Sequence, residues 1–147
     1  MERVIVINDK WQSESKKSGD EFELNVLVDL KSRGFTNIEK NVYIPGTGCE
    51  VDFLADNLEY IEAKGGNDGD KKRPGARRTD NVKKAIANAS LIKAIYPDIT
   101  YVIYFSAKAQ SGSYSSEMIK VALAKHIVDE IRYLEQSPEI DDTPTLF

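Results

Sequence analysis

The residues best suited to chemistry lie between positions 49 and 64. The segments Cys49–Leu54 and Tyr60–Lys64 have the pattern of two short strands, joined by a turn at Asp56-Asn57. Side chains alternate between the two faces of a strand, so Asp52, Glu62 and Lys64 converge on one side if residue 52 pairs with residue 60 or 62. Two carboxylates and a lysine can bind a hard divalent cation and activate a water beside it. The arrangement suggests metal-dependent hydrolysis of a phosphodiester.

Two further carboxylates are candidates for this site. Glu50 alternates with Asp52 and is therefore predicted to face the same way, whereas Cys49, Val51 and Phe53 face the core. On a helical wheel Glu23 lies near the middle of an apolar helix face, between Leu27 and Leu30. A carboxylate directed into a core is costly unless a metal ion or a lysine pairs with it. The alternative is a structural salt bridge from Glu23 to Lys64 or to an arginine.

The tripeptide Glu62-Ala63-Lys64 has little weight when it is taken alone. Glu14-Ser15-Lys16 has the same pattern in a polar stretch, and short motifs recur by chance. The weight comes from the surrounding strands, from Asp52 on the preceding strand and from Glu23. The metal-site hypothesis therefore depends on four placed residues rather than on one motif.

The order of predicted elements defines the fold that must position these residues. The sequence predicts a helix over 20–33 with Gly34 as its cap, a first strand over 41–44 and then the two motif strands. It next predicts a helix from Thr79 or Asp80 to Ile95, a buried strand over 99–105 and a helix over 116–134. Short connections favour an antiparallel meander for the first three strands, and a helical crossover lets the last strand join in parallel. We expect an α/β fold with a mixed sheet flanked by helices.

Composition limits the class of protein. A chain of 147 residues with 41% hydrophobic and 30% charged residues fits one globular domain over 1–147. We expect an N-terminal arm over 1–18, a core over 19–135 and a disordered tail over 136–147. A single cysteine excludes an internal disulfide framework and a cysteine-ligated zinc site. The apolar run Val4–Ile7 is too short for a signal peptide or a membrane span, so we expect a cytoplasmic protein without a membrane partner.

The charge is distributed unevenly. The net charge is −4, but residues 65–84 contain seven cations against three aspartates, so this window is +4 and the remainder −8. A basic patch on an acidic body can still hold phosphates. The alternative is a solvated loop. The predicted DNA contacts are Lys71, Lys72, Arg73, Arg77, Arg78, Lys83 and Lys84.

Other residues that could do chemistry have more ordinary interpretations. His126 lies on the predicted last helix, far in sequence from the motif, and we expect it to pack or to face solvent. Tyr101 and Tyr104 lie in the apolar strand, where packing is expected. Glu59 points away from Glu62 and is expected to be exposed.

With Gly19 and Glu23 in the first helix, Asp52 on the second strand and Glu62-x-Lys64 ending the third, the chain resembles the PD-(D/E)xK nuclease superfamily. That superfamily includes many restriction endonucleases and the archaeal Holliday-junction resolvases. One departure is visible, because Val51 stands where the family pattern has proline.

The resemblance implies a restriction endonuclease-like core of helix, three strands, helix and strand from about residue 20 to residue 106. It does not cover the N-terminal arm or the predicted last helix, which is an extra C-terminal element. It also implies that Asp52, Glu62 and the carbonyl of Ala63 ligate Mg²⁺, with Mn²⁺ as an alternative. Lys64 would orient or help deprotonate the attacking water, and Glu23 would act through a water or a second ion.

These inferences together predict a metal-dependent endonuclease acting on DNA. The alternatives are a non-catalytic nucleic-acid-binding module on the same fold and a structural protein whose acids form salt bridges. A homodimer formed through the last helix or the N-terminal arm would permit paired cuts. Restriction-like, junction-resolving and homing-type or phage-encoded nucleases all remain open.

Overall fold

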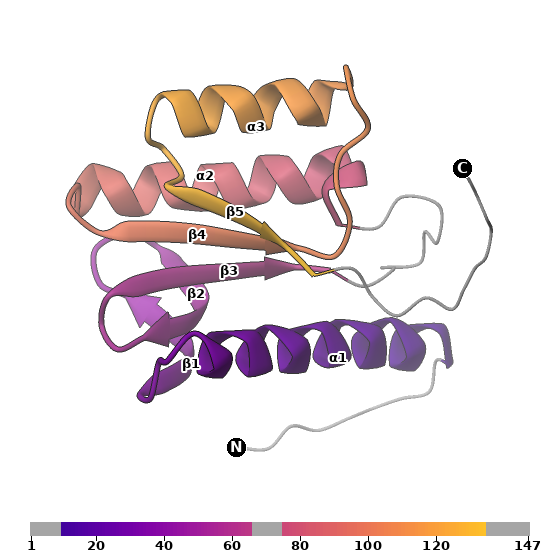
Figure 1. Ribbon diagram of the computed structural model, residues 1–147, viewed down its shortest axis with the longest axis horizontal. Helices are drawn as coiled ribbons and strands as arrows, with labels where there is room; N and C mark the ends of the chain where they lie inside the picture. The colour runs from indigo at the N-terminus through magenta and orange to yellow at the C-terminus, as the bar shows by residue number, and fades with distance from the viewer. Residues whose placement is uncertain (1–9, 66–74, 135–147) are drawn as a thin grey trace.

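The protein is an α/β fold, with a five-stranded mixed sheet and three α-helices (Figure 1). The computed structural model describes residues 10–65 and 75–134, and the side chains from residue 20 onward within them. The elements are α1 (Lys10–Ser32), β1 (Ile38–Ile44), β2 (Cys49–Ala55), β3 (Glu59–Lys64), a 3₁₀ turn (Gly75–Arg77), α2 (Thr79–Ile95), β4 (Thr100–Phe105), α3 (Tyr114–Ala124) and β5 (Glu130–Tyr133).

The strand order confirms the predicted meander and crossover. The sheet has the order β1-β2-β3-β4-β5, in which β1, β2 and β3 pair antiparallel and β3, β4 and β5 pair parallel. Three residues separate the paired Ala55 and Glu59, and Asp56 and Asn57 among them have positive φ, so the amide of Leu58 can donate to Ala55 across a tight turn. Both crossovers advance in the same direction along the sheet. Since such crossovers are right-handed, α2 and α3 cover the same face, and α1 covers the other (Figure 1).

Each face of the sheet has its own hydrophobic core. On the α1 face, Phe22, Val26 and Leu30 pack against Ile61 and Tyr104. On the other face, residues of α2 and α3 pack with Val51, Tyr101, Ile103 and Phe105. The three buried residues of α1 follow one another at intervals of four, as a helix lying on a sheet requires.

The helix α3 is shorter than predicted, because the prediction extended it to residue 134. It ends at Ala124, and residues 130–133 form β5 instead. His126 takes a left-handed φ of 59°, its amide donates to Leu123, and the amide of Ile127 donates to Ala122. This is the Schellman arrangement, which usually has glycine at the left-handed position. Because histidine stands there, the sequence lacks the usual stop signal, and the apolar spacing misled the prediction.

The first helix also differs from its prediction, at its start. It begins at Lys10, so residues 10–18, which were predicted to belong to the N-terminal arm, are helical. Its end is confirmed: Gly34 has a φ of 100°, its amide donates to Lys31, and that of Phe35 donates to Leu30. The predicted bounds of α2 are confirmed, and Arg78 occupies its N-cap position without a side-chain hydrogen bond. The predicted tail over 136–147 and residues 1–9 of the arm lie outside the described residues.

Of the helices that the structure describes, none has the length and apolar character needed to cross a membrane.

Candidate active site

The predicted site lies where two neighbouring strands separate. β2 pairs with β1 on both sides of Asp52 but with β3 only through Phe53–Ala55, whereas the end of β3 pairs only with β4. Extending the β2–β3 register by one residue from the Phe53–Ile61 pair sets Asp52 opposite Glu62. The two strands therefore form a fork, and both carboxylates stand at its base.

The side chain of Asp52 closes the fork. Its Oδ2 accepts a hydrogen bond from the main-chain amide of Ala63 at 2.7 Å, in the place of a strand partner. In a strand the N–H and C=O of one residue point to the same side, so the carbonyl of Ala63 also faces Asp52. This brings a carboxylate and a main-chain carbonyl together, as a hard-cation site requires.

The strand β2 changes faces at Asp52, which corrects the predicted alternation. Cys49 and Val51 pack in the core beneath α2 and α3, and Phe53 packs in the core beneath α1. The Sγ of Cys49 lies 3.6 Å from Oδ1 of Asn88 on α2, which confirms its direction. At this point the ladder with β1 lacks its pair at Asp52, opposite Asn41, whose φ of 53° interrupts the extended backbone of β1. Glu50 is exposed; burial is the main cause of the raised pKa of Asp52, and the charge of Glu50 adds to it.

Glu62 is held firmly on the α2 face. It is 5% exposed, and its Oε1 accepts hydrogen bonds from the hydroxyl of Tyr101 at 2.9 Å and the amide of Asn88 at 3.4 Å. Its Oε2 lies 3.4 Å from Nζ of Lys64. One oxygen is therefore fixed by the protein, and the other stands beside the lysine. Sequence reasoning missed both Tyr101 and Asn88, because the strand around Tyr101 is apolar and nothing pairs the two in sequence.

The three carboxyl groups influence one another. Burial, followed by repulsion from Asp52, raises the pKa of Glu62, and burial also raises that of Asp52. Lys64 and hydrogen bonds oppose both shifts. Burial and then the charge of Asp52 raise the pKa of Glu23, while Lys40 opposes this shift. Crowded carboxylates of this kind are destabilised without a cation, which fits a site for a divalent metal ion.

Glu23 lies beside this site, and it does not form part of a group of side chains that together could bind a metal ion. It is half-buried at the edge of the α1 stripe formed by Phe22 and Val26, not at its middle as predicted. Over residues 10–65 and 75–134, no three Asp, Glu, His or Cys side chains are close enough together to hold a metal ion. The site therefore has two carboxylates and one carbonyl within reach of each other, and Glu23 stands behind them.

A polar hollow of about 240 Å³ adjoins Glu23 and Lys64. Lys84 of α2 lines it together with Asn81, whereas Lys83 lines a different groove on the α2–α3 side. Of the predicted DNA contacts, Arg77 is exposed and Arg78 half-buried on the approach to α2. Lys71, Lys72 and Arg73 lie outside the described residues. The structure thus brings Lys84 next to the carboxylates and directs Lys83 elsewhere.

A second network of charges was not predicted. Arg132 of β5 is buried, donates to Glu59 at 3.0 and 2.9 Å and to Glu130, and contacts the hydroxyl of Tyr104. Tyr104 in turn donates to Asp29 at 2.6 Å. Glu59 is therefore paired and partly buried rather than free in solvent, and both tyrosines of β4 use their hydroxyls. His126 is exposed in the turn after α3.

Comparison of the chain with protein-family models, with curated proteins and with solved structures gives no match.

Proposed function

We propose that this protein is a metal-dependent endonuclease that hydrolyses phosphodiester bonds in DNA, on a fold of the restriction endonuclease-like type. The observation that supports the proposal most strongly is the fork at Asp52 and Glu62. There the buried carboxylate of Glu62, the half-buried carboxylate of Asp52, the carbonyl of Ala63 and the side chain of Lys64 meet at the end of a strand. The element order also fits, because a helix and three antiparallel strands precede a helical crossover to a parallel strand.

The residues at the fork fit Mg²⁺ or Mn²⁺, because hard oxygen donors are those that such cations prefer. Asp52, Glu62 and the carbonyl of Ala63 would hold the ion, and water and phosphate oxygens would complete its shell. When bound, the ion would supply Lewis-acid activation of water and phosphate. Glu23 would support the site through a water or a second ion.

The protein groups supply orientation and charge. Tyr101 and Asn88 keep one oxygen of Glu62 occupied, so its other oxygen has a defined direction. Lys64 stands beside that oxygen, from which it would orient the attacking water and offset negative charge that grows on the phosphate. Lys84 faces the adjoining hollow, where it would contact a neighbouring DNA phosphate.

A non-catalytic nucleic-acid-binding module is the second candidate. The lack of three clustered ligating side chains among residues 10–65 and 75–134 favours it. The two candidates differ in one outcome: both predict salt-sensitive DNA binding that Lys84→Ala weakens, but only the nuclease predicts cleavage that needs a divalent ion.

The test is incubation of the full chain with supercoiled, linear and four-way-junction DNA, in Mg²⁺, Mn²⁺ or EDTA. We expect cleavage only with a divalent ion, and a loss of at least about a hundredfold in Asp52→Asn and Lys64→Met. Glu39→Gln, an exposed acid on β1, is the matched control and should cleave as the wild type does. Cleavage in EDTA would defeat the proposal, and DNA binding without cleavage of any substrate would favour the second candidate.

A further inference from the structure

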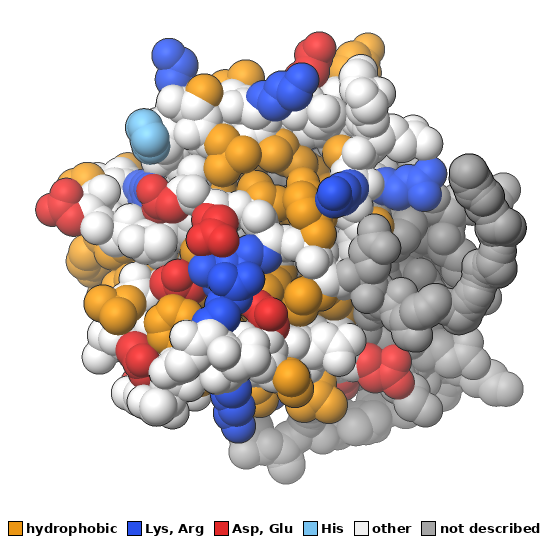
Figure 2. Space-filling model, viewed as in Figure 1, with side chains coloured by type: hydrophobic (Ala, Val, Ile, Leu, Met, Phe, Trp, Pro, Cys, Tyr) orange, Lys and Arg blue, Asp and Glu red, His pale blue; other side chains and the backbone are white. Residues whose placement is uncertain are grey.

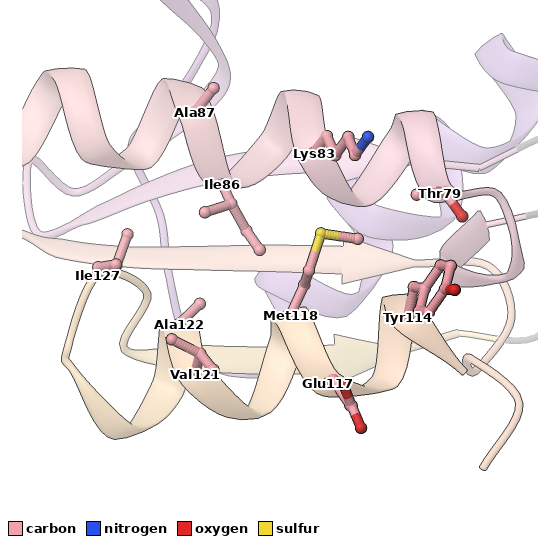
Figure 3. Close-up of a pocket in the computed structure, with 10 residues that line it drawn as sticks. All are labelled: Thr79, Lys83, Ile86, Ala87, Tyr114, Glu117, Met118, Val121, Ala122 and Ile127. Atoms are coloured by element: carbon pink, nitrogen blue, oxygen red, sulfur yellow. The ribbon is translucent and has the colours of Figure 1, made fainter. Parts of the chain in front are cut away.

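A largely apolar groove of about 680 Å³ runs between α2 and α3, on the helical layer that covers one face of the sheet (Figure 3). Ile86 and Met118 project into it from the two helices, and Tyr114 stands at one end. The helix side that carries Asn81, Lys84 and Asn88 belongs to the candidate active site. The groove is therefore a separate surface, formed by the other side of α2.

The groove continues into exposed apolar side chains. Tyr114 is 80% exposed, Val121 56% and Leu91 52%. Leu91 follows Ala87 of the groove by one helical turn, so it lies on the same side of α2. Hydrophobic side chains gather in the region where α2 and α3 lie (Figure 2). An apolar surface of this extent is typical of a protein–protein interface.

The charges at this groove complement one another. Lys83 of α2 and Glu117 of α3 both line it, and each lies about one turn from the start of its helix. Neither is in an ion pair with another residue that the structure describes. α2 and α3 run in the same direction (Figure 1). A two-fold axis that lies in the contact plane and runs parallel to the groove would therefore place α3 of one copy parallel to and against α2 of the other.

We propose that this face, with Ile86, Tyr114, Met118 and Val121 in its apolar part, binds a second copy of the chain. In a two-fold interface each contact occurs twice with the partners exchanged, so Lys83 of each copy faces Glu117 of the other. The groove carries one positive and one negative side chain, so a second copy of this chain brings the opposite charge to each of them. We therefore take the chain itself as the occupant. The active-site side of α2 stays open in both copies. If the proposed function holds, such a dimer presents two cutting sites to one DNA molecule.

The charge pair gives a test that does not use nuclease activity. The molar mass of the full chain would be measured by light scattering and sedimentation over a wide range of concentrations. We expect a wild-type dimer, and in Lys83→Glu and Glu117→Lys, each of which brings like charges together twice, a dissociation constant raised at least about tenfold. A mixture of these two variants should form heterodimers, because both contacts then join opposite charges.

Two further variants complete the design. Val121→Asp should also weaken the dimer, while Lys31→Glu, an exposed charge reversal on α1 across the sheet, should leave it unchanged. Circular dichroism would confirm that each variant is folded. A wild-type monomer at every concentration, dimers unaffected by the single reversals, or a mixture of the two reversals that stays monomeric would each overturn the proposal.

Discussion

The carboxylate of Asp52 accepts a hydrogen bond at 2.7 Å from the main-chain amide of Ala63, where the ladder between β2 and β3 has already ended. The side chain thereby replaces a main-chain acceptor and keeps the amide of Ala63 paired. One oxygen of Asp52 thus serves the fold while its charge is available to a cation. The fold and the proposed catalysis depend on the same carboxyl group of Asp52. Two different substitutions of this residue can separate the two roles.

Asp52→Asn and Asp52→Ala should therefore differ. The asparagine oxygen can still accept from Ala63, so we expect Asp52→Asn to lose metal-dependent cleavage while its melting temperature stays equal to that of the wild type or rises. Asp52→Ala leaves the amide without its acceptor, and we expect a loss of about 1–3 kcal/mol. Thermal unfolding in EDTA beside a cleavage assay measures both. Equal stability of the two variants would show that the hydrogen bond does not support the fork.

Glu62 should make the metal-free protein less stable as the pH rises. Its pKa is raised above 4.5 by burial and by Asp52, so the folded state binds more protons than the unfolded state. Below the pKa of the unfolded state, Glu62 is protonated in both the folded and the unfolded state, so it does not lower stability. As the pH rises through the window between the unfolded and the raised folded pKa, the unfolded chain ionises first and stability falls.

Glu62→Gln should remove this penalty. In EDTA at neutral pH we expect it to be more stable than the wild type by roughly 1–2 kcal/mol, and the difference should vanish near about pH 4. Mg²⁺ should stabilise the wild type and not the variant. Urea unfolding across this pH range, with Glu39→Gln as the control, measures the effect. A pH-independent difference would mean that ionisation of Glu62 is not its cause.

Substitution of the two tyrosines of β4 should separate activity from stability. Tyr101 donates to Glu62 at 2.9 Å, so Tyr101→Phe should weaken metal affinity or cleavage by about 10–100-fold while the fold is retained. Tyr104 donates to Asp29 on the other face, so Tyr104→Phe should lower stability and leave cleavage intact. Titration calorimetry with Mn²⁺ and a cleavage assay separate the two effects. Equal metal affinity in the two variants would remove Tyr101 from the site.

The sequence was sufficient for the part of the site that depends on local pattern. Strand alternation, the Asp56-Asn57 turn and the motif spacing predicted that Asp52, Glu62 and Lys64 would meet. The change of face at Asp52 was not predictable in this way, because it lies where the ladder between β1 and β2 is interrupted opposite Asn41, which takes a left-handed φ of 53°. The hydrogen bonds of Tyr101 and Asn88 to Glu62 join residues far apart in sequence, and only the packing of α2 on the sheet brings them together.

The error in the last element has a local cause. The apolar spacing from Ile119 to Leu134 continues through the turn at His126, and histidine gives no signal that a helix must stop. A strand of only four residues, Glu130–Tyr133, then has little pattern of its own. The parallel pairing with β4 decides its conformation, and it positions Arg132.

Arg132 should contribute more to stability than any exposed arginine. It is 7% exposed and paired with Glu59 and Glu130, so Arg132→Met leaves carboxylates without their buried partner and should cost about 3–5 kcal/mol. Arg33→Met is the matched control, because Arg33 is 41% exposed in its pair with Asp29 and should cost less than about 1 kcal/mol. Urea unfolding in EDTA compares the two. Equal losses would show that the network around Arg132 is no stronger than a surface ion pair, and a cleavage defect in folded Arg132→Met would connect it to the site.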